Sequence, residues 1–208
     1  MPVWCLLTNK QIDNEIHEQG FCVIDDFLPP HLYLLLRETA VGMHNKGQFR
    51  SAKIGHQFGT MENTTIRTDQ ICWLDDDTKN PSLKAYFAKI NSIAEQLNRA
   101  LFLGLVDFET HFAIYQPGSF YKKHIDQFAN SRDRRISCVY YLNEHWQDSF
   151  AGQLKLYNSE NKLIKSILPL PNRFVCFSSD LPHEVCETKQ TRYSLAGWMK
   201  TRAMSLID

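Results

Sequence analysis

The sequence predicts a mainly β fold of the α+β class, with a double-stranded β-helix (jelly-roll) core braced by N-terminal helices. The second half of the chain contains seven short runs of β-type residues, separated by turn signals such as Pro117-Gly118, Asn158-Ser159 and Pro171-Asn172. The first half instead carries apolar residues at helical spacing. Short strands joined by tight turns behind a helical third favour an antiparallel jelly-roll.

Three segments of the first half are expected to be helical. Thr8 is a candidate N-cap with Gln11 three residues on, and Gly20 marks the end of this helix. Pro29-Pro30 opens a leucine-rich helix, and Asn80-Pro81 opens another with apolar residues at three- and four-residue steps. The expected segments are Thr8 to Gly20, Leu32 to His44 with a stop near Gly47, and Pro81 to Leu101.

A long loop is expected between the second and third helices. Residues Phe49 to Asn63 include Gly55, Gly59 and many polar side chains without periodicity, which is typical of a mobile lid. A short strand, Phe21 to Asp25, is expected after the first helix. The other expected strands are Glu109 to Tyr115, Tyr121 to Asp126, Arg135 to Leu142, Gly152 to Tyr157, Leu163 to Leu168, Arg173 to Phe177 and Tyr193 to Met199.

The size and charge of the chain limit its function classes. With 208 residues and 43% hydrophobic content, residues 1–208 are expected to form a single domain, with helical support mainly over 8–104 and the jelly-roll mainly over 105–201. Basic and acidic residues balance at 23 each, so no strong field favours nucleic acid or an anionic membrane. A protein or a small molecule is the expected partner, and a monomer is expected.

Cysteine usage favours a reducing compartment. The six cysteines are scattered without a Cys-x-x-Cys pair, which argues against both a disulfide scaffold and a zinc ribbon. The N-terminus lacks a basic region followed by an apolar stretch, and nowhere do 18 uncharged apolar residues run together. We therefore expect a cytoplasmic protein without a membrane span.

His124, Asp126 and His183 are the candidate metal ligands and catalytic centre. Side chains at positions i and i+2 of a strand lie on one face about 6 to 7 Å apart, so His124 and Asp126 could chelate one ion. The pair alone is weak evidence, because this composition places a His-x-Asp/Glu triplet about once by chance. Closure of the barrel could bring His183 to them, and two imidazoles with one carboxylate on one face of iron(II) leave three positions open, as in non-haem oxygenases.

Arg192, nine residues after His183, is the candidate anion-binding residue. An arginine inside a barrel needs an anion, and its planar fork matches a carboxylate bidentately. A dicarboxylate co-substrate would satisfy it, and Tyr115 and Tyr141, on neighbouring expected strands, could donate phenolic hydrogen bonds to the same ligand.

Together these residues resemble the signature of the 2-oxoglutarate- and iron(II)-dependent dioxygenases, and several stretches resemble the hypoxia-inducible-factor-type prolyl 4-hydroxylases, so that we expect a bacterial member. The resemblance covers roughly residues 20 to 200, in the order of the family's motifs. It is carried by Tyr115-Gln116-Pro117-Gly118, Tyr121-Lys122-Lys123-His124-Ile125-Asp126, Cys138-Val139-Tyr140-Tyr141-Leu142-Asn143, His183-Glu184-Val185 and Thr191-Arg192-Tyr193, and by Ile66 to Trp73, which is similar to the end of the family's substrate-covering loop.

The resemblance implies roles for these residues. His124, Asp126 and His183 would bind Fe(II), Arg192 and Tyr141 would hold the distal carboxylate of 2-oxoglutarate, and Tyr115 its metal-proximal end. In the substrate-covering region it implies that Arg67 lies in the lid, that Asp69 of the lid pairs with Arg134 of the core, and that Trp198 lines the pocket.

The implied reaction is hydroxylation of a peptidyl proline at C4 with O2 and 2-oxoglutarate as co-substrates, succinate and CO2 as products, and ascorbate as an accessory reductant. Elongation factor Tu is the substrate implied by analogy with bacterial relatives. Two departures stand out: Tyr115 precedes His124 by nine residues, one fewer than expected of the animal enzymes, and Ala196 stands where a polar residue is expected near the metal.

Alternatives remain open at this point. The chain could be a 2-oxoglutarate oxygenase acting on another protein side chain, a free amino acid or an alkylated base, or a catalytically silent jelly-roll that binds a ligand or senses oxygen. For single residues, Arg192 could form a structural salt bridge, and Tyr115, Tyr141 and Trp198 could be core aromatics. His111, two residues after Glu109, fits the polar face of a strand better than a second metal site.

Overall fold

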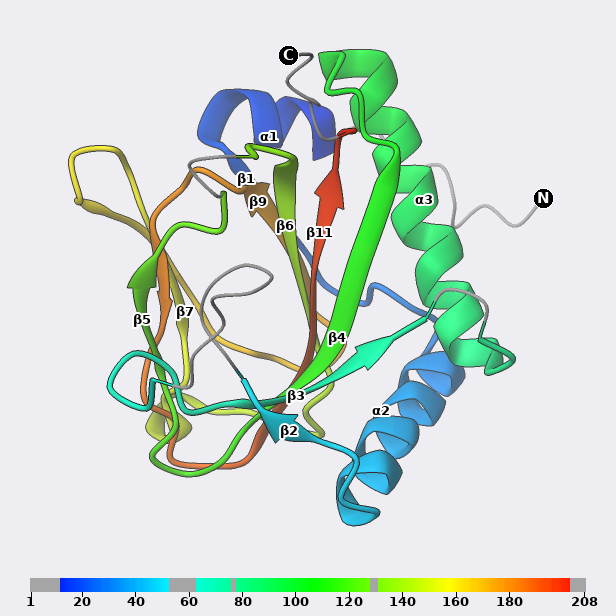
Figure 1. The fold of residues 1–208 in the computed structure, drawn as a ribbon, viewed down its shortest axis with the longest axis vertical. Coiled ribbons are helices and arrows are strands. Elements are labelled where there is room, and N and C mark those ends of the chain that lie inside the picture. The colour runs from blue at the N-terminus through cyan, green and yellow to red at the C-terminus, as the bar shows by residue number, and fades with distance from the viewer. Residues whose placement is uncertain (1–11, 53–62, 76–77, 128–130, 203–208) are drawn as a thin grey trace, which may run out of the picture.

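The computed structural model describes residues 12–52, 63–75, 78–127 and 131–202, and these form two antiparallel sheets with helices on one side (Figure 1). The large sheet has the order β1 (Phe21–Ile24), β9 (Phe174–Ser178), β6 (Arg134–Tyr141), β11 (Arg192–Lys200), β4 (Asp107–Tyr115), β3 (Gln70–Leu74) and β2 (Arg50–Ser51). The small sheet has the order β5 (Tyr121–His124), β10 (His183–Val185), β7 (Leu154–Tyr157) and β8 (Leu163–Ile167).

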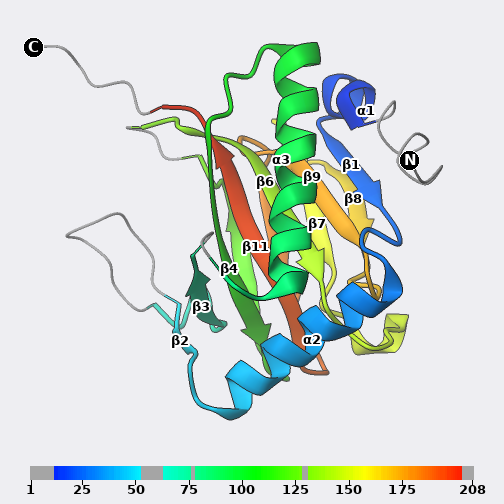
Figure 2. The ribbon, with the colours of Figure 1, turned by 90° about the vertical axis from the view of Figure 1, so that its right-hand side faces the viewer.

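Three helices, α1 (Ile12–Gln19), α2 (Pro30–Asn45) and α3 (Pro81–Leu101), lie on the same side of the large sheet, as Figure 2 shows most clearly for α2 and α3. The Asn80 side chain caps α3 by accepting hydrogen bonds from the backbone N–H groups of Ser82 and Leu83. None of the helices in the described ranges is long and apolar enough to cross a membrane.

Side chains alternate between the two faces of the large sheet, so one face contributes to the core and the other to a candidate site. On β4, Phe112 and Ile114 join the core that packs against the helices, whereas Ala113 and Tyr115 belong to an apolar cluster on the opposite face. On β11, Leu195 is likewise a core residue of the helical side. The face opposite the helices is turned toward the small sheet, where Tyr141 packs with residues of β7. Functional side chains are therefore expected between the two sheets.

The predicted class is confirmed: the described fold is mainly β, antiparallel in every pairing, with helices contributed by the N-terminal half. The second and third helices and the strand after the first helix are also confirmed, within two residues of their expected bounds. The proposed cap at Thr8 and most of the predicted loop lie outside the described residues.

Three short strands were not predicted. β2 occupies two residues of the expected loop, β3 begins within the segment Ile66 to Trp73 that is similar to the substrate-covering loop, and β10 occupies only three residues. Each is defined by pairing with a strand distant in sequence, such as β3 with β4 and β10 with β7. Periodicity within the two residues of β2 or the three of β10 cannot indicate a strand. β3 has five residues, but its pairing with β4 was not visible in the local sequence.

Candidate active site

His124, Asp126 and His183 meet between the two sheets. His124 ends β5 and His183 begins β10, and the two are direct partners across this antiparallel pair. His124 Nε2 lies 3.5 Å from Asp126 Oδ1, and His183 Nε2 lies 3.3 Å from Asp126 Oδ2. One potential ligand atom from each residue lies within 4.8 Å of the other two. The predicted convergence of these three side chains is therefore present.

The expected strand from Tyr121 to Asp126 is too long. β5 ends at His124, and Asp126 lies in a bend beyond it, so the two residues do not share one strand face. The bend allows the Asp126 carboxylate to accept a hydrogen bond from Ser137 Oγ of β6, at 2.7 Å. The prediction of one strand and one face was wrong in this detail, because the carboxylate is placed by a side-chain partner on the large sheet.

Both imidazoles are oriented by backbone carbonyls. His124 Nδ1 lies 2.7 Å from the Lys122 carbonyl oxygen, and His183 Nδ1 lies 2.9 Å from that of Leu181. Each Nδ1–H therefore donates to a carbonyl, which leaves each Nε2 directed at Asp126. In the neutral imidazole this Nε2 carries the lone pair that a metal ligand requires. Two imidazole nitrogens and one carboxylate oxygen suit iron(II) with positions left open for other ligands, so the residues present fit that ion.

The three groups are strongly coupled electrostatically. Burial raises the pKa of the Asp126 carboxyl, but His183 and His124 outweigh it and hold that pKa well below its ordinary value. Burial lowers the pKa of His183, but the Asp126 carboxylate outweighs it and raises that pKa overall. Burial and the neighbouring His183 lower the pKa of His124. The carboxylate is thus kept ionised and calls for a positive partner, which a divalent cation would supply.

Two serine hydroxyls form a hydrogen-bonded pair next to the Asp126 carboxylate. Ser137 Oγ contacts Ser179 Oγ at 2.9 Å as well as Asp126 Oδ2, and both serines are buried. We expect Ser137→Ala to weaken Mn(II) binding by about tenfold, because loss of an outer-sphere partner typically costs about 10- to 100-fold in metal affinity. Isothermal titration calorimetry measures this, with Ser137→Thr as the control that retains the hydroxyl. Equal affinity in the alanine variant would contradict the role given to Ser137.

Arg192 is buried beside the same space without an anionic partner. It is 1% exposed, and no described carboxylate forms an ion pair with it. Its Nη1 donates a weak hydrogen bond to Ser194 Oγ at 3.3 Å, and its Nε has no partner in the part of the chain that the structure describes. A structural salt bridge among the described residues is therefore excluded as the reason for this arginine. A buried guanidinium is costly unless an anion compensates it.

Two tyrosine rings flank this guanidinium. Arg192 Cζ lies 4.8 Å from the ring centre of Tyr115 and 4.9 Å from that of Tyr141. Tyr115 is the direct partner of Arg192 across β4 and β11, and β11 lies between β4 and β6, so the strands of the two tyrosines are not neighbours as expected. The Tyr141 hydroxyl is buried without a hydrogen-bond partner among the described residues. Burial raises the pKa of both phenols, so they remain protonated donors at neutral pH. A carboxylate ligand would satisfy Arg192 and Tyr141 together.

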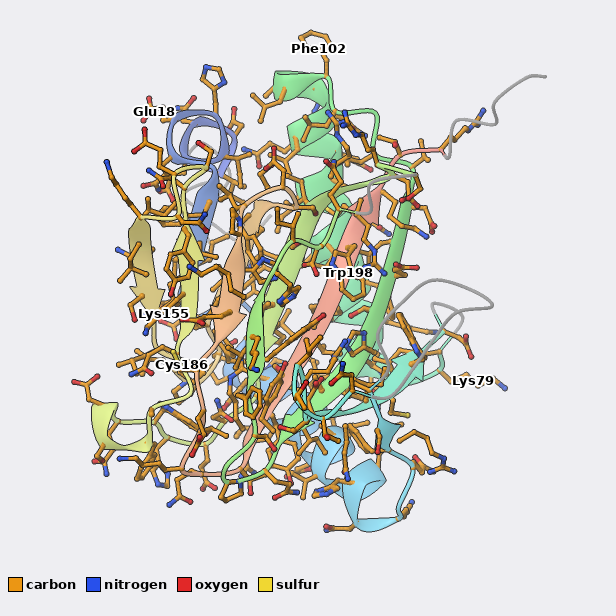
Figure 3. The ribbon with its side chains drawn as sticks, turned by 60° about the vertical axis from the view of Figure 1, so that its left-hand side comes forward. Glu18, Lys79, Phe102, Lys155, Cys186 and Trp198 are labelled. Carbon is orange, nitrogen blue, oxygen red and sulfur yellow. The ribbon has the colours of Figure 1, made fainter. Side chains whose placement is uncertain are left out.

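A cavity of about 420 Å³ joins these elements. Its lining includes the three candidate metal ligands together with Tyr115, Arg192, Arg67, Asp69, Trp73, His111, Arg134, Ala196 and Trp198. Figure 3 shows Trp198 on β11, and Lys155 of β7 and Cys186 beyond β10 on the side of the small sheet. The cavity is large enough for a small dicarboxylate and one inserted side chain.

Comparison with known proteins decides the family. The model of the 2OG-Fe(II) oxygenase superfamily matches residues 110–200, which include every candidate ligand named above. The crystal structure of a Pseudomonas putida prolyl-4-hydroxylase is similar over 92% of this chain and 98% of that one, with 33% identity and a TM-score of 0.83. The chain belongs to the 2OG-Fe(II) oxygenase superfamily. It is therefore a dioxygenase that uses Fe(II), 2-oxoglutarate and O2, as the resemblance implied.

Other relatives of this oxygenase point to the prolyl hydroxylases. Human prolyl hydroxylase EGLN3 is 27% identical over 190 residues, which cover 88% of this chain and 79% of that protein. A prolyl hydroxylase from Trichoplax adhaerens, solved with a hypoxia-inducible-factor peptide fragment, has 26% identity and a TM-score of 0.84 over 96% of this chain and 94% of that one. The resemblance to prolyl hydroxylases drawn from the sequence motifs is confirmed.

The residues assigned to the substrate-covering region have other partners than expected. Asp69 accepts from Arg67 Nε and Nη2 at 2.8 and 2.6 Å, and Arg134 donates to Glu109 Oε1 at 2.7 Å. The expected pairing of Asp69 with Arg134 is not among the contacts of the described residues. Asp69 pairs with Arg67 instead, which lies two residues before it on the same extended segment. Arg134 still lines the cavity, with its guanidinium 3.6 Å from the ring centre of Trp198.

The cavity residues that the sequence left unassigned or assigned to other roles include His111, Tyr121 and Ser137. His111 is 3% exposed, lies beside the rings of Trp73 and Trp198, and its Nδ1 has no partner. Burial, with Arg67 and Arg134 nearby, lowers the pKa of His111 to about 3, so its imidazole is neutral. Alternation on β4 could have placed His111 with Tyr115, since the two are four residues apart on one face.

Proposed function

We propose that this oxygenase hydroxylates a prolyl residue of a protein substrate at C4, with conversion of 2-oxoglutarate and O2 to succinate and CO2. The observation that carries the proposal is the buried Arg192, which has no carboxylate partner among the described residues and lines the same cavity as the cluster of His124, Asp126 and His183. The cluster fits iron(II), and the arginine fits the far carboxylate of 2-oxoglutarate. The prolyl hydroxylases among the relatives support the choice of proline.

In this proposal, the 2-oxoglutarate site is built from the large sheet. Arg192 and the Tyr141 hydroxyl hold the distal carboxylate, which pairs both buried groups at once. Tyr115 would donate a hydrogen bond to the end of 2-oxoglutarate that lies nearer the metal. Because the rings of Tyr115 and Tyr141 also flank the guanidinium, they restrict its movement and exclude water from the ion pair.

The three metal ligands and the cavity walls have separate roles in the proposed reaction. Iron held by His124, Asp126 and His183, together with 2-oxoglutarate and O2, supplies the oxidation that places one oxygen atom in a C–H bond. Trp73, His111 and Trp198 form an aromatic wall that can receive a prolyl ring, since their ring centres lie 4.8 to 6.3 Å apart. The wall and the buried Arg67–Asp69 pair limit the entry of water.

Elongation factor Tu is the proposed protein substrate, by analogy with bacterial relatives. We also propose that the oxygenase acts as a monomer. The described cysteines are free thiols, in keeping with a cytoplasmic protein.

Incubation with purified elongation factor Tu from the host cell tests the substrate. With Fe(II), 2-oxoglutarate and ascorbate, we expect one of its prolines to gain the mass of an oxygen atom, as measured by mass spectrometry of its peptides. Omission of 2-oxoglutarate is the control. If elongation factor Tu is unchanged while other host proteins gain hydroxyproline, the substrate is wrong and prolyl hydroxylation stands. If oxygen appears on another kind of side chain, the proposed reaction is wrong.

A further inference from the structure

A three-layer stack ends on one of the candidate metal ligands. The ring of Tyr121 lies parallel to the imidazole of His124, with ring centres 3.6 Å apart and planes 14° apart. Arg67 Cζ lies 4.3 Å from the centre of the same tyrosine ring. Two groups cannot occupy one face at these distances, so the guanidinium and the imidazole lie on opposite faces of Tyr121. The tyrosine is sandwiched between them.

Arg67, the outer layer of the stack, is held in place both by its own side-chain hydrogen bonds and by those of the neighbouring backbone. Arg67 makes two hydrogen bonds to Asp69, and the side chains of Arg67 and Asp69 are 12% and 0% exposed. The backbone around Arg67 also pairs with the backbone around Tyr121: Thr68 N–H donates to the Phe120 carbonyl, and Lys122 N–H donates to the Ile66 carbonyl. The segment 66–69 is therefore attached to β5 as a short additional ladder.

The inner layer limits the rotation of His124. The hydrogen bond from Nδ1 to the Lys122 carbonyl directs Nε2 toward Asp126 and His183. That bond alone permits the ring to tilt, whereas a parallel ring at 3.6 Å resists tilting. The faces of an aromatic ring carry negative potential, so Tyr121 attracts the guanidinium on one side and, on the other, an imidazole made more positive by a bound cation.

We propose that Tyr121 is a positioning residue for His124, and that through it the segment 66–69 and the metal site stabilise each other. This inference rests on the proposed metal site and adds to it a coupling between the metal and the Arg67 segment. Linkage requires the coupling to act in both directions: loss of the stack weakens metal binding, and metal binding steadies the segment.

Mn(II) affinity of the otherwise intact chain, without co-substrate or protein substrate, tests the positioning role. We expect Tyr121→Leu to raise the Kd by about tenfold or more, the range of lost outer-sphere partners, and Tyr121→Phe to stay within about twofold because it keeps the ring. Equal affinity in wild type and folded Tyr121→Leu would overturn the proposal. Equal weakening by both variants would also overturn it, since the hydroxyl would then be responsible.

Arg67→Met provides an independent variant if Tyr121→Leu does not fold. It removes the outer layer and is expected to raise the Mn(II) Kd by about threefold, a fraction of the effect of losing the ring. Combined with Tyr121→Leu, it should add little, because both act through one stack. Full additivity, or an unchanged Kd in Arg67→Met, would overturn the link to Arg67.

Amide hydrogen exchange tests the reverse direction. Addition of Mn(II) should slow exchange at Thr68 and Lys122 in wild type and have a smaller effect in Tyr121→Leu. Unchanged exchange in wild type at saturating Mn(II) would overturn the coupling. If wild type binds no Mn(II), the proposed metal site itself is wrong. If wild type binds Mn(II) and the Tyr121 variants bind it with the same Kd, the metal site stands and only the positioning role of Tyr121 is wrong.

Discussion

Asp126→Ala is expected to lower 2-oxoglutarate turnover by more than about 100-fold, because even the loss of an outer-sphere partner costs about 10- to 100-fold in metal affinity. Asp126 is the only carboxylate of the described metal-ligand cluster, and both His124 Nε2 and His183 Nε2 are directed at it. Without it, two neighbouring imidazoles would face a cation with no anionic ligand. Succinate formation measures the effect.

The effect of Asp126→Ala must be separated from loss of folding. Asp148→Ala is a matched control, because Asp148 is an exposed carboxylate in a short helix, Asp148–Phe150, away from the cluster. Thermal denaturation should show both variants folded, with Mn(II) binding retained only in Asp148→Ala. Near-normal turnover in a folded Asp126→Ala enzyme would refute the metal assignment.

Arg192→Ala is expected to raise the KM for 2-oxoglutarate on the order of 100-fold, which corresponds to about 3 kcal/mol, the upper range for a hydrogen bond to a charged group. The reason is that Arg192 is buried, lacks a described anionic partner, and would lose its bidentate contact with the carboxylate. Steady-state kinetics with varied 2-oxoglutarate measure this. Mn(II) affinity should change little.

Two variants give controls for Arg192. Arg192→Lys keeps the charge without the planar fork, so we expect a KM between those of wild type and Arg192→Ala. Arg99→Ala removes an exposed arginine of α3 and should leave KM unchanged. A KM in folded Arg192→Ala equal to that of wild type would exclude Arg192 from the co-substrate site.

Most of the fold could be predicted from local patterns. Proline and asparagine at their N-termini mark α2 and α3, and α3 presents Leu83, Phe87 and Ile90 to the core at helical steps, as the sequence indicates. The long strands β4, β6 and β11 also carry enough residues for their pattern to appear. β10 does not, because three residues acquire strand geometry only by pairing with β5 and β7.

The candidate site was predictable in its residue types and less so in its geometry. The spacing of His124, Asp126, His183 and Arg192 predicted side chains that line one cavity, but Asp126 lies in a bend and accepts a hydrogen bond from Ser137, which is distant in sequence. Long-range partners of this kind leave no local signal. The pairing of Asp69 was mispredicted for the related reason that an ion pair depends on the path of the backbone.

If this cavity transfers oxygen from O2 to a protein proline, incubation with isotopically heavy O2 will label both products. Host-cell protein is incubated with the enzyme, Fe(II) and 2-oxoglutarate, and mass spectrometry follows the label. The prediction is one heavy oxygen in succinate and one on a prolyl residue, with neither formed by Asp126→Ala. Labelled succinate without labelled hydroxyproline, or hydroxyproline carrying only light oxygen, would contradict it.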